Sequence, residues 1–358
     1  MKSRQPTQRG YTLVELLVAM TIGIVLIGAV IMVYVTQTQI YKATNSQAGT
    51  QNAENAIAAL VTPAIRAAGF MGCSNIWQPL VSNLNAGGPP PVGTLATPSL
   101  LAGYDASGTA GTGTLNLTQR NPANDSVVTH WTPNLHSTLA SQVETGSDVL
   151  VVLGALPGSQ PVAVTTIAPA ATTLTVQSAS GLAAGQFAVV SDCGKATIFK
   201  ITGVAGTTLT HAAGAAALEN VTATLPVNFS LPLLIPIQQT AIYVAQGQGG
   251  QSVLKLATYS GGAWTASPLV PGVQTMQVLY GVDTNADGVV DKYVPASTLT
   301  AATPVYSVRL GFLIEGQPGS AGPTNPTQFT ILGTTVNIPQ DTRQRRVYEM
   351  TVNLRNAS

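Results

Sequence analysis

Residues 8–20 read QRGYTLVELLVAM and join a basic, polar N-terminus to an apolar stretch that continues to Val35. From Tyr11 to Val35 the only charged residue is Glu15. As an α-helix this stretch would extend about 37 Å at 1.5 Å per residue, more than the roughly 30 Å of a hydrocarbon layer. We therefore predict a membrane-spanning helix, residues 11–36, with one carboxylate near its start.

The distribution of basic residues gives the orientation of this helix. Lys2, Arg4 and Arg9 precede the apolar stretch, and only Lys42 follows it closely. The positive-inside rule then places the N-terminus in the cytoplasm and the rest of the chain outside. The sequence AVIMVYVTQTQIYKA, which ends the stretch, offers no convincing small-residue site for removal of a secretory signal, so we expect the apolar segment to stay with the protein.

The position of Glu15 has two interpretations. A carboxylate in a membrane helix costs several kcal/mol at the centre and less near an end, so Glu15 can reach the headgroups. Alternatively, it pairs with a positive group inside an assembly, where loss of water makes the pairing selective. The residues alone leave both open.

Overall composition excludes a nucleic-acid-binding surface. The chain has 15 Lys+Arg against 14 Asp+Glu, only 8% charged residues, and abundant Gly and Pro. Such a composition suits a β-rich extracytoplasmic protein, and no basic field exists for nucleic acid. The only basic cluster after the N-terminus is interpreted as a solvated strand edge: Arg343, Arg345, Arg346 and Arg355.

After the membrane segment the helical pattern continues over residues 37–70, as an amphipathic extension. An apolar face at helical spacing should pack against the rest of the protein: Ile57, Leu60, Val61, Ala64, Ile65 and Ala68. Pro63 is expected to kink or end the helix, and Gly69 is a plausible stop signal.

The remainder, residues 71–358, reads as one β-rich head, which makes the fold class α+β. Residues 79–145 are rich in Gly, Pro, Thr, Asn and Ser and are expected to form long surface loops with short strands. Runs such as DVLVVLG, TAIYVA and VYSVRLGFLIE predict strands, AQGQGGQ predicts a hairpin turn, and an inserted lobe is expected near 155–225.

One acidic loop, YGVDTNADGVVDKY, has the ligand spacing of a calcium loop. Hard oxygen atoms alternate along it, from Asp283, Asn285, Asp287, the Val289 carbonyl and Asp291. Val294 stands where an EF-hand calcium loop has its bidentate Glu, and the positive charge of Lys292 would repel a cation. A turn that needs no ion is the alternative. Calcium is the one cofactor predicted.

The N-terminal motif resembles the class III signal of type IV pilins and of the pseudopilins of type II secretion. This resemblance implies that a prepilin peptidase cuts after Gly10, that Tyr11 is the methylated mature N-terminus, and that Glu15 pairs with a subunit's N-terminal amine during docking. Tyr11 departs from the usual Phe but keeps an aromatic ring.

Later blocks extend the resemblance. AIRAAGFMGC, VVSDCGKATIFKIT, LVPGVQTMQVLYGVDTNADGVVDKY, YSVRLGFLI and RRVYEMTVNLRN are similar to the PilW family of minor pilins, itself similar to the J-type pseudopilin. This implies a long helix packed on a β head, a single-pass inner-membrane protein with a periplasmic head that later enters the pilus. It would prime assembly in a tip complex with other minor pilins and the major pilin, and so support twitching motility.

Three alternatives accompany this prediction. A secretion pseudopilin would leave twitching intact, a tip adhesin would use the loops to bind a surface, and an enzyme is disfavoured because the chain has no GxSxG, HExxH or P-loop motif. In an oxidising periplasm the two cysteines, Cys73 and Cys193, are expected to form a disulfide, with two buried thiols as the alternative.

Overall fold

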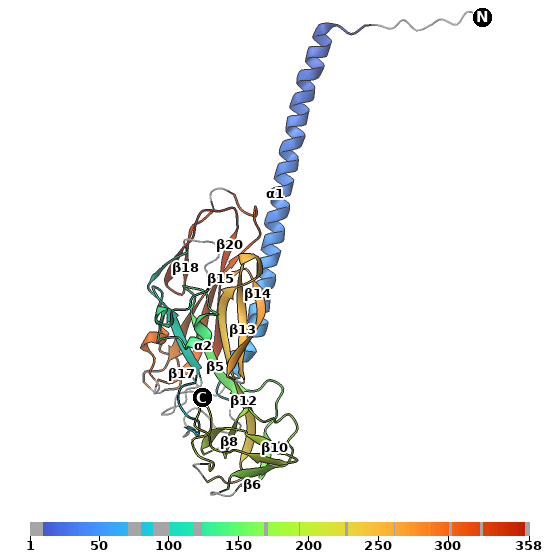
Figure 1. Cartoon of the computed structure of the whole chain (residues 1–358). Helices are drawn as coiled ribbons and strands as arrows, with labels where there is room; N and C mark the ends of the chain where they lie inside the picture. The colour runs from blue at the N-terminus through green and yellow to red at the C-terminus, as the bar shows by residue number, and fades with distance from the viewer. Residues whose placement is uncertain are drawn as a thin grey trace, which may run out of the picture.

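The protein is represented by a computed structural model, which describes residues 10–70, 80–88, 101–117, 124–167, 171–192, 194–225, 228–260, 262–285, 287–300, 303–322 and 325–354. A long N-terminal helix, α1 (Leu13–Arg66), stands on a β-rich head (Figure 1). The first half of α1 projects beyond the head, and its second half lies along the head's side. This arrangement confirms the predicted α+β class.

The largest sheet of the head is organised around its longest strand, β12 (Leu233–Gln246). β12 is rich in apolar and β-branched residues, and it is buried almost continuously, as expected for a central strand. The predicted hairpin turn at 245–251 connects β12 to β13. The strands that pair around this hairpin are β2 (Leu101–Ala106), β5 (Val149–Ala155), β8 (Phe187–Ser191), β13 (Ser252–Ser260) and β14 (Ala263–Pro271).

A second, four-stranded antiparallel sheet carries the C-terminal part of the chain. Its order is β16-β15-β17-β20, and its register places Glu315 at the end of β17 directly opposite Arg345 at the start of β20. Its strands are β15 (Val273–Val282), β16 (Lys292–Val294), β17 (Val305–Glu315) and β20 (Arg345–Asn353). A small third sheet joins β18 (Gln328–Ile331) and β19 (Thr334–Asn337) to β3 (Thr114–Asn116).

The main core lies between α1 and the two larger sheets. Ile57, Val61 and Ile65 of α1 are fully buried against strands of both sheets, including Val244 of β12, Leu310 of β17 and other members of one cluster. The helix therefore forms part of the head's core over its last three turns.

The structure contains a distal lobe where the sequence indicated an insertion. It hangs from the end of the head farthest from the helix N-terminus (Figure 1). Its own apolar core includes Leu174, Phe199, Leu209 and Leu234. Its strands are β6 (Val162–Ile167), β7 (Thr173–Val176), β9 (Ala196–Lys200), β10 (Gly203–Ala205) and β11 (Thr208–Thr210), with β1 (Leu80–Ser82) paired to β9.

The expectation of surface loops over 79–145 was wrong for much of the described part. β2 pairs with β5 inside the large sheet, and Trp131, Leu135, Leu139 and Val143 are at most 2% exposed. These side chains come from β4 (Trp131–Thr132), from α2 (Ser137–Ala140) and from the segments beside them. The stretch is irregular in backbone but contributes one wall of the head's second core.

Candidate functional site: helix α1 and its attachment to the head

The start of α1 is closed by a capping box. Thr12 is the N-cap, and its hydroxyl oxygen accepts a hydrogen bond from the Glu15 amide at 3.3 Å. In return, the Glu15 carboxylate accepts from the Thr12 amide, also at 3.3 Å. The pattern Thr-x-x-Glu is readable in the sequence, and this role of Glu15 was missed there. Gly10, Tyr11 and Glu15 are all exposed.

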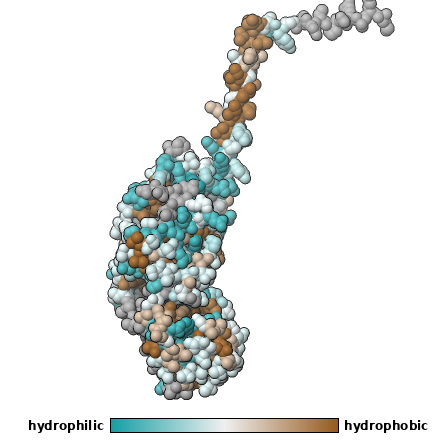
Figure 2. Space-filling model, viewed as in Figure 1, coloured by the Kyte–Doolittle hydropathy of each residue, from teal (hydrophilic) through white to brown (hydrophobic). Residues whose placement is uncertain are grey.

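Within the described residues, the apolar half of α1 stands clear of the head. Leu13 is 76% exposed, Ile24 67% and Met32 74%, and the most apolar stretch of the helix has no buried residue. By length and composition it can cross a membrane. Figure 2 shows this half as a hydrophobic rod that becomes hydrophilic just above the head.

The lower half of α1 docks through the predicted apolar face, with two corrections. Leu60 remains 44% exposed, because it lies about 100° around the helix from the buried Val61. Pro63 does not end the helix, which continues to Arg66. Pro63 and Ala59 are both exposed, so water can satisfy the Ala59 carbonyl that the proline cannot pair.

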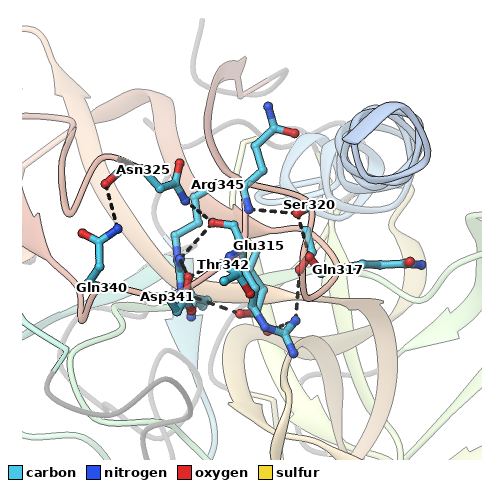
Figure 3. A network of polar contacts seen from close by, with 12 residues as sticks. Glu315, Gln317, Ser320, Asn325, Gln340, Asp341, Thr342 and Arg345 are labelled. Atoms are coloured by element: carbon cyan, nitrogen blue, oxygen red, sulfur yellow. Dashed lines mark hydrogen bonds and ion pairs between the residues drawn. The ribbon is translucent and has the colours of Figure 1, made fainter. Parts of the chain in front are cut away.

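A buried ionic network fastens the strand that α1 packs against. The Arg345 guanidinium donates to both oxygens of Asp341, at 2.7 and 2.8 Å, and to the Gln274 amide oxygen at 2.7 Å. Glu315 lies 4.0 Å from Arg345 and 3.6 Å from Arg343. We call these five residues the β17–β20 clamp. Figure 3 labels Glu315, Asp341 and Arg345 of this clamp and shows the helix beside them.

The clamp shows that the interpretation of the basic cluster as a solvated edge was wrong for Arg343 and Arg345. The side chains of Arg345 and Glu315 are 1% and 0% exposed, and that of Arg343 is 10% exposed. Partial burial raises the pKa of Asp341, but the hydrogen bonds from Arg345 and the Arg343 amide outweigh it and leave the pKa below its usual range. Arg355 lies outside the described residues.

One surface ion pair links the helix directly to the clamp's strand. The Arg346 side chain, 48% exposed, lies 2.8 Å from Glu54 of α1. Arg345 and Arg346 thus point in opposite directions from neighbouring positions of β20, as alternation along a strand requires.

The loop predicted to bind calcium connects β15 to β16. The Asp283 carboxylate accepts hydrogen bonds from the amides of Asn285 and Gly288, at 3.0 and 2.7 Å. The Asp291 carboxylate accepts from the Thr284 amide and hydroxyl, which hold its pKa below the usual range. Within the described residues no three His, Cys, Asp or Glu side chains are grouped closely enough to share a metal ion. The loop brings the predicted ligands onto one turn, and the calcium site stays a prediction.

The predicted disulfide also stays a prediction, because Cys73 and Cys193 both lie outside the described residues.

Comparison with known families covers both ends of the chain. Residues 6–31 match the family model described as Prokaryotic N-terminal methylation motif, and residues 241–356 match that of Type IV Pilus-assembly protein W. The chain matches a PilW-like type IV pilin. This confirms the resemblance inferred from the sequence. No curated protein and no solved structure matches the chain.

The PilW match and the clamp coincide in the sequence. All five clamp residues, from Gln274 to Arg345, lie inside the matched segment, as do β14, β17 and β20, which contact α1. Residues 32–240, which include the docking half of α1 and the distal lobe, lie outside both matches. The two matches thus cover most of the apolar half of α1 and the C-terminal segment, whose strands pack against the lower half of α1.

Proposed function

We propose that this protein is a minor pilin that joins other minor pilins in a complex that primes type IV pilus assembly. It acts as a structural subunit, inserted in the inner membrane with a periplasmic head and later placed near the fibre tip. The observation that carries the proposal is the apolar half of α1, which stands free of its own head and overlaps the matched methylation motif, residues 6–31. The PilW match supports the same assignment.

The forces that would drive assembly depend on what surrounds α1 before and after it docks against other subunits. In a bilayer the apolar side chains are already among hydrocarbon, so close packing and polar pairing, rather than the hydrophobic effect, favour association between helices. Ala19 and Gly23 form a small-xxx-small pair on one side of α1, and a Cβ at Gly23 would meet nothing within 4 Å. A neighbouring helix can approach closely there.

Glu15 would supply the polar pairing. Its carboxylate carries the only charge between residues 11 and 35, and a charge buried among apolar helices is stable only with a partner. Cleavage after Gly10 creates a new amine at Tyr11 on each subunit, which is the partner that the proposal assigns. Within one chain the carboxylate caps its own helix, so docking would exchange that cap for an intersubunit ion pair.

A gene deletion, complemented with defined variants, tests the proposal. Surface pili and exported enzymes are scored separately. The proposal expects loss of pili and of twitching with normal secretion, and restoration by the wild-type gene. Loss of secretion with intact pili would instead assign the protein to type II secretion, and normal pili whose surface adhesion is lost would make it an adhesin.

Cleavage is tested with a single substitution. Gly10→Ala should leave an uncut precursor in the membrane and fail to complement the deletion. A precursor that is still shortened by ten residues would refute the assignment of Gly10 and Tyr11.

A further inference from the structure

Helix α1 and the segment that follows β17 touch at one unusually close point. Ser46 is 2% exposed although its neighbours Asn45 and Gln47 are exposed. A Cβ built on Gly316 would lie 1.8 Å from the Ser46 Oγ atom and 3.2 Å from both the Ser46 Cβ and the Gln344 carbonyl oxygen. Only glycine at 316 permits this approach.

The backbone at Gly316 cannot easily move away from the helix. Its amide donates to the Gln344 carbonyl at 2.7 Å, and its carbonyl accepts from the Arg343 guanidinium at 3.0 Å. The preceding amide, of Glu315, donates to the Gly272 carbonyl at 2.8 Å. These three hydrogen bonds, one of them from Arg343 of the β17–β20 clamp, therefore hold Gly316 in place against α1.

The apolar contacts of α1 determine which face of the helix meets the head. They do not by themselves determine the position of the head along the helix axis. Ile57, Val61 and Ile65 recur every four residues, so a slide of about 6 Å, one turn, would place one buried side chain where the next had been. The same slide would bring Lys42 or Thr50 against Gly316. Both side chains are larger than that of Ser46.

We propose that the Ser46–Gly316 contact, together with the Glu54–Arg346 ion pair and the hydrogen bond from the Gly69 amide to the Leu153 carbonyl at 2.9 Å, fixes the position of the head along α1, so that the head sits at one defined height above the membrane segment. The distance along the helix from Glu15 to Ser46 is about 46 Å at 1.5 Å per residue. If α1 packs into a fibre as proposed above, this contact determines where each head meets its neighbours. That role in the fibre rests on the proposed function, whereas the contact itself does not.

A steric rescue tests the contact. In the full chain, purified in detergent, Gly316→Ala should displace the head along α1, and adding Ser46→Ala should restore it, because the nearest helix atom is then Cβ at 3.2 Å. The matched control is Gly322→Ala in the same segment, where a Cβ would meet nothing within 4 Å. The control should behave as wild type.

Two readouts separate the contact from the proposed function. Spin labels at the exposed positions Thr36 and Thr265 should report a shift of up to about 6 Å for Gly316→Ala, reversed in the double variant. The amount of subunit in sheared fibres should fall and recover in parallel. An unchanged label distance in Gly316→Ala, or a shifted one that Ser46→Ala does not reverse, would overturn the inference. Rescued distances with no wild-type subunit in fibres would leave the contact intact and refute the pilin function.

Discussion

Replacement of Arg345 by methionine should strongly destabilise the head, because it removes the central cation of the β17–β20 clamp. The side chain of Arg345 is 1% exposed and that of Glu315 is 0% exposed. Without Arg345, Glu315 loses the guanidinium at 4.0 Å and retains Arg343 at 3.6 Å, and the Gln274 oxygen loses its 2.7 Å donor. Removal of one partner from a buried ion pair typically costs about 3 to 5 kcal/mol. Lysine should not restore the clamp, since it cannot bind Asp341 through two parallel hydrogen bonds.

Urea unfolding of the full chain in detergent measures this cost, with the buried Trp131 and Trp264 as fluorescent reporters. At an m-value of about 3 kcal/mol/M the midpoint should fall by about 1 to 1.7 M. The control is Arg346→Met, the adjacent strand position, whose half-exposed pair with Glu54 should contribute less than about 1 kcal/mol. Equal shifts for the two variants would refute the claim that burial, rather than charge itself, makes the clamp important.

Three further predictions test separate parts of the molecule. Gly23→Leu should leave processing and head stability unchanged but reduce subunit in sheared fibres, because it fills the side where a neighbouring helix would approach; normal incorporation would exclude that packing face. Burial raises the pKa of the Glu144 carboxyl from 4.5 to about 8, so its contribution to stability is complete below pH 4.5 and is lost as pH rises towards 8. Glu144→Gln should flatten the fall in melting temperature over this window, and an unchanged slope would contradict the shift. If loop 283–291 binds calcium, about 1 mM calcium should raise the melting temperature, and Asp287→Ala should abolish the rise; no rise in the wild type would favour the ion-free turn.

The sequence predicted the helix, its docking face and most strands, because these depend on local periodicity. Ile57, Val61 and Ile65 repeat at helical spacing, and β20 alternates between its two faces. The predicted burial of Leu60 was wrong because a residue at the margin of an apolar stripe is buried only if the opposing surface is wide enough. The predicted end of the helix at Pro63 was wrong because the free-energy cost of a proline in a helix depends on whether the unpaired carbonyl meets water, which the sequence does not show.

The clamp could not be read from the arginines alone. Their partner Glu315 lies 30 positions away from Arg345 in the chain and meets it only through the antiparallel register of β17 and β20. The burial of residues 131–143 could not be predicted for a similar reason. The Gly- and Pro-rich flanks indicated loops, whereas Trp131 and Leu139 pack against strands that are distant in the sequence. The Thr12–Glu15 cap, in contrast, was a local signal.

The most direct test of the account is the identity of the N-terminus of the protein recovered from sheared surface fibres. Mass spectrometry should find a chain that begins at N-methylated Tyr11 and retains the whole of α1. A chain that still begins at Met1, or one that starts beyond Val35 without the apolar half of α1, would contradict assembly through the membrane helix.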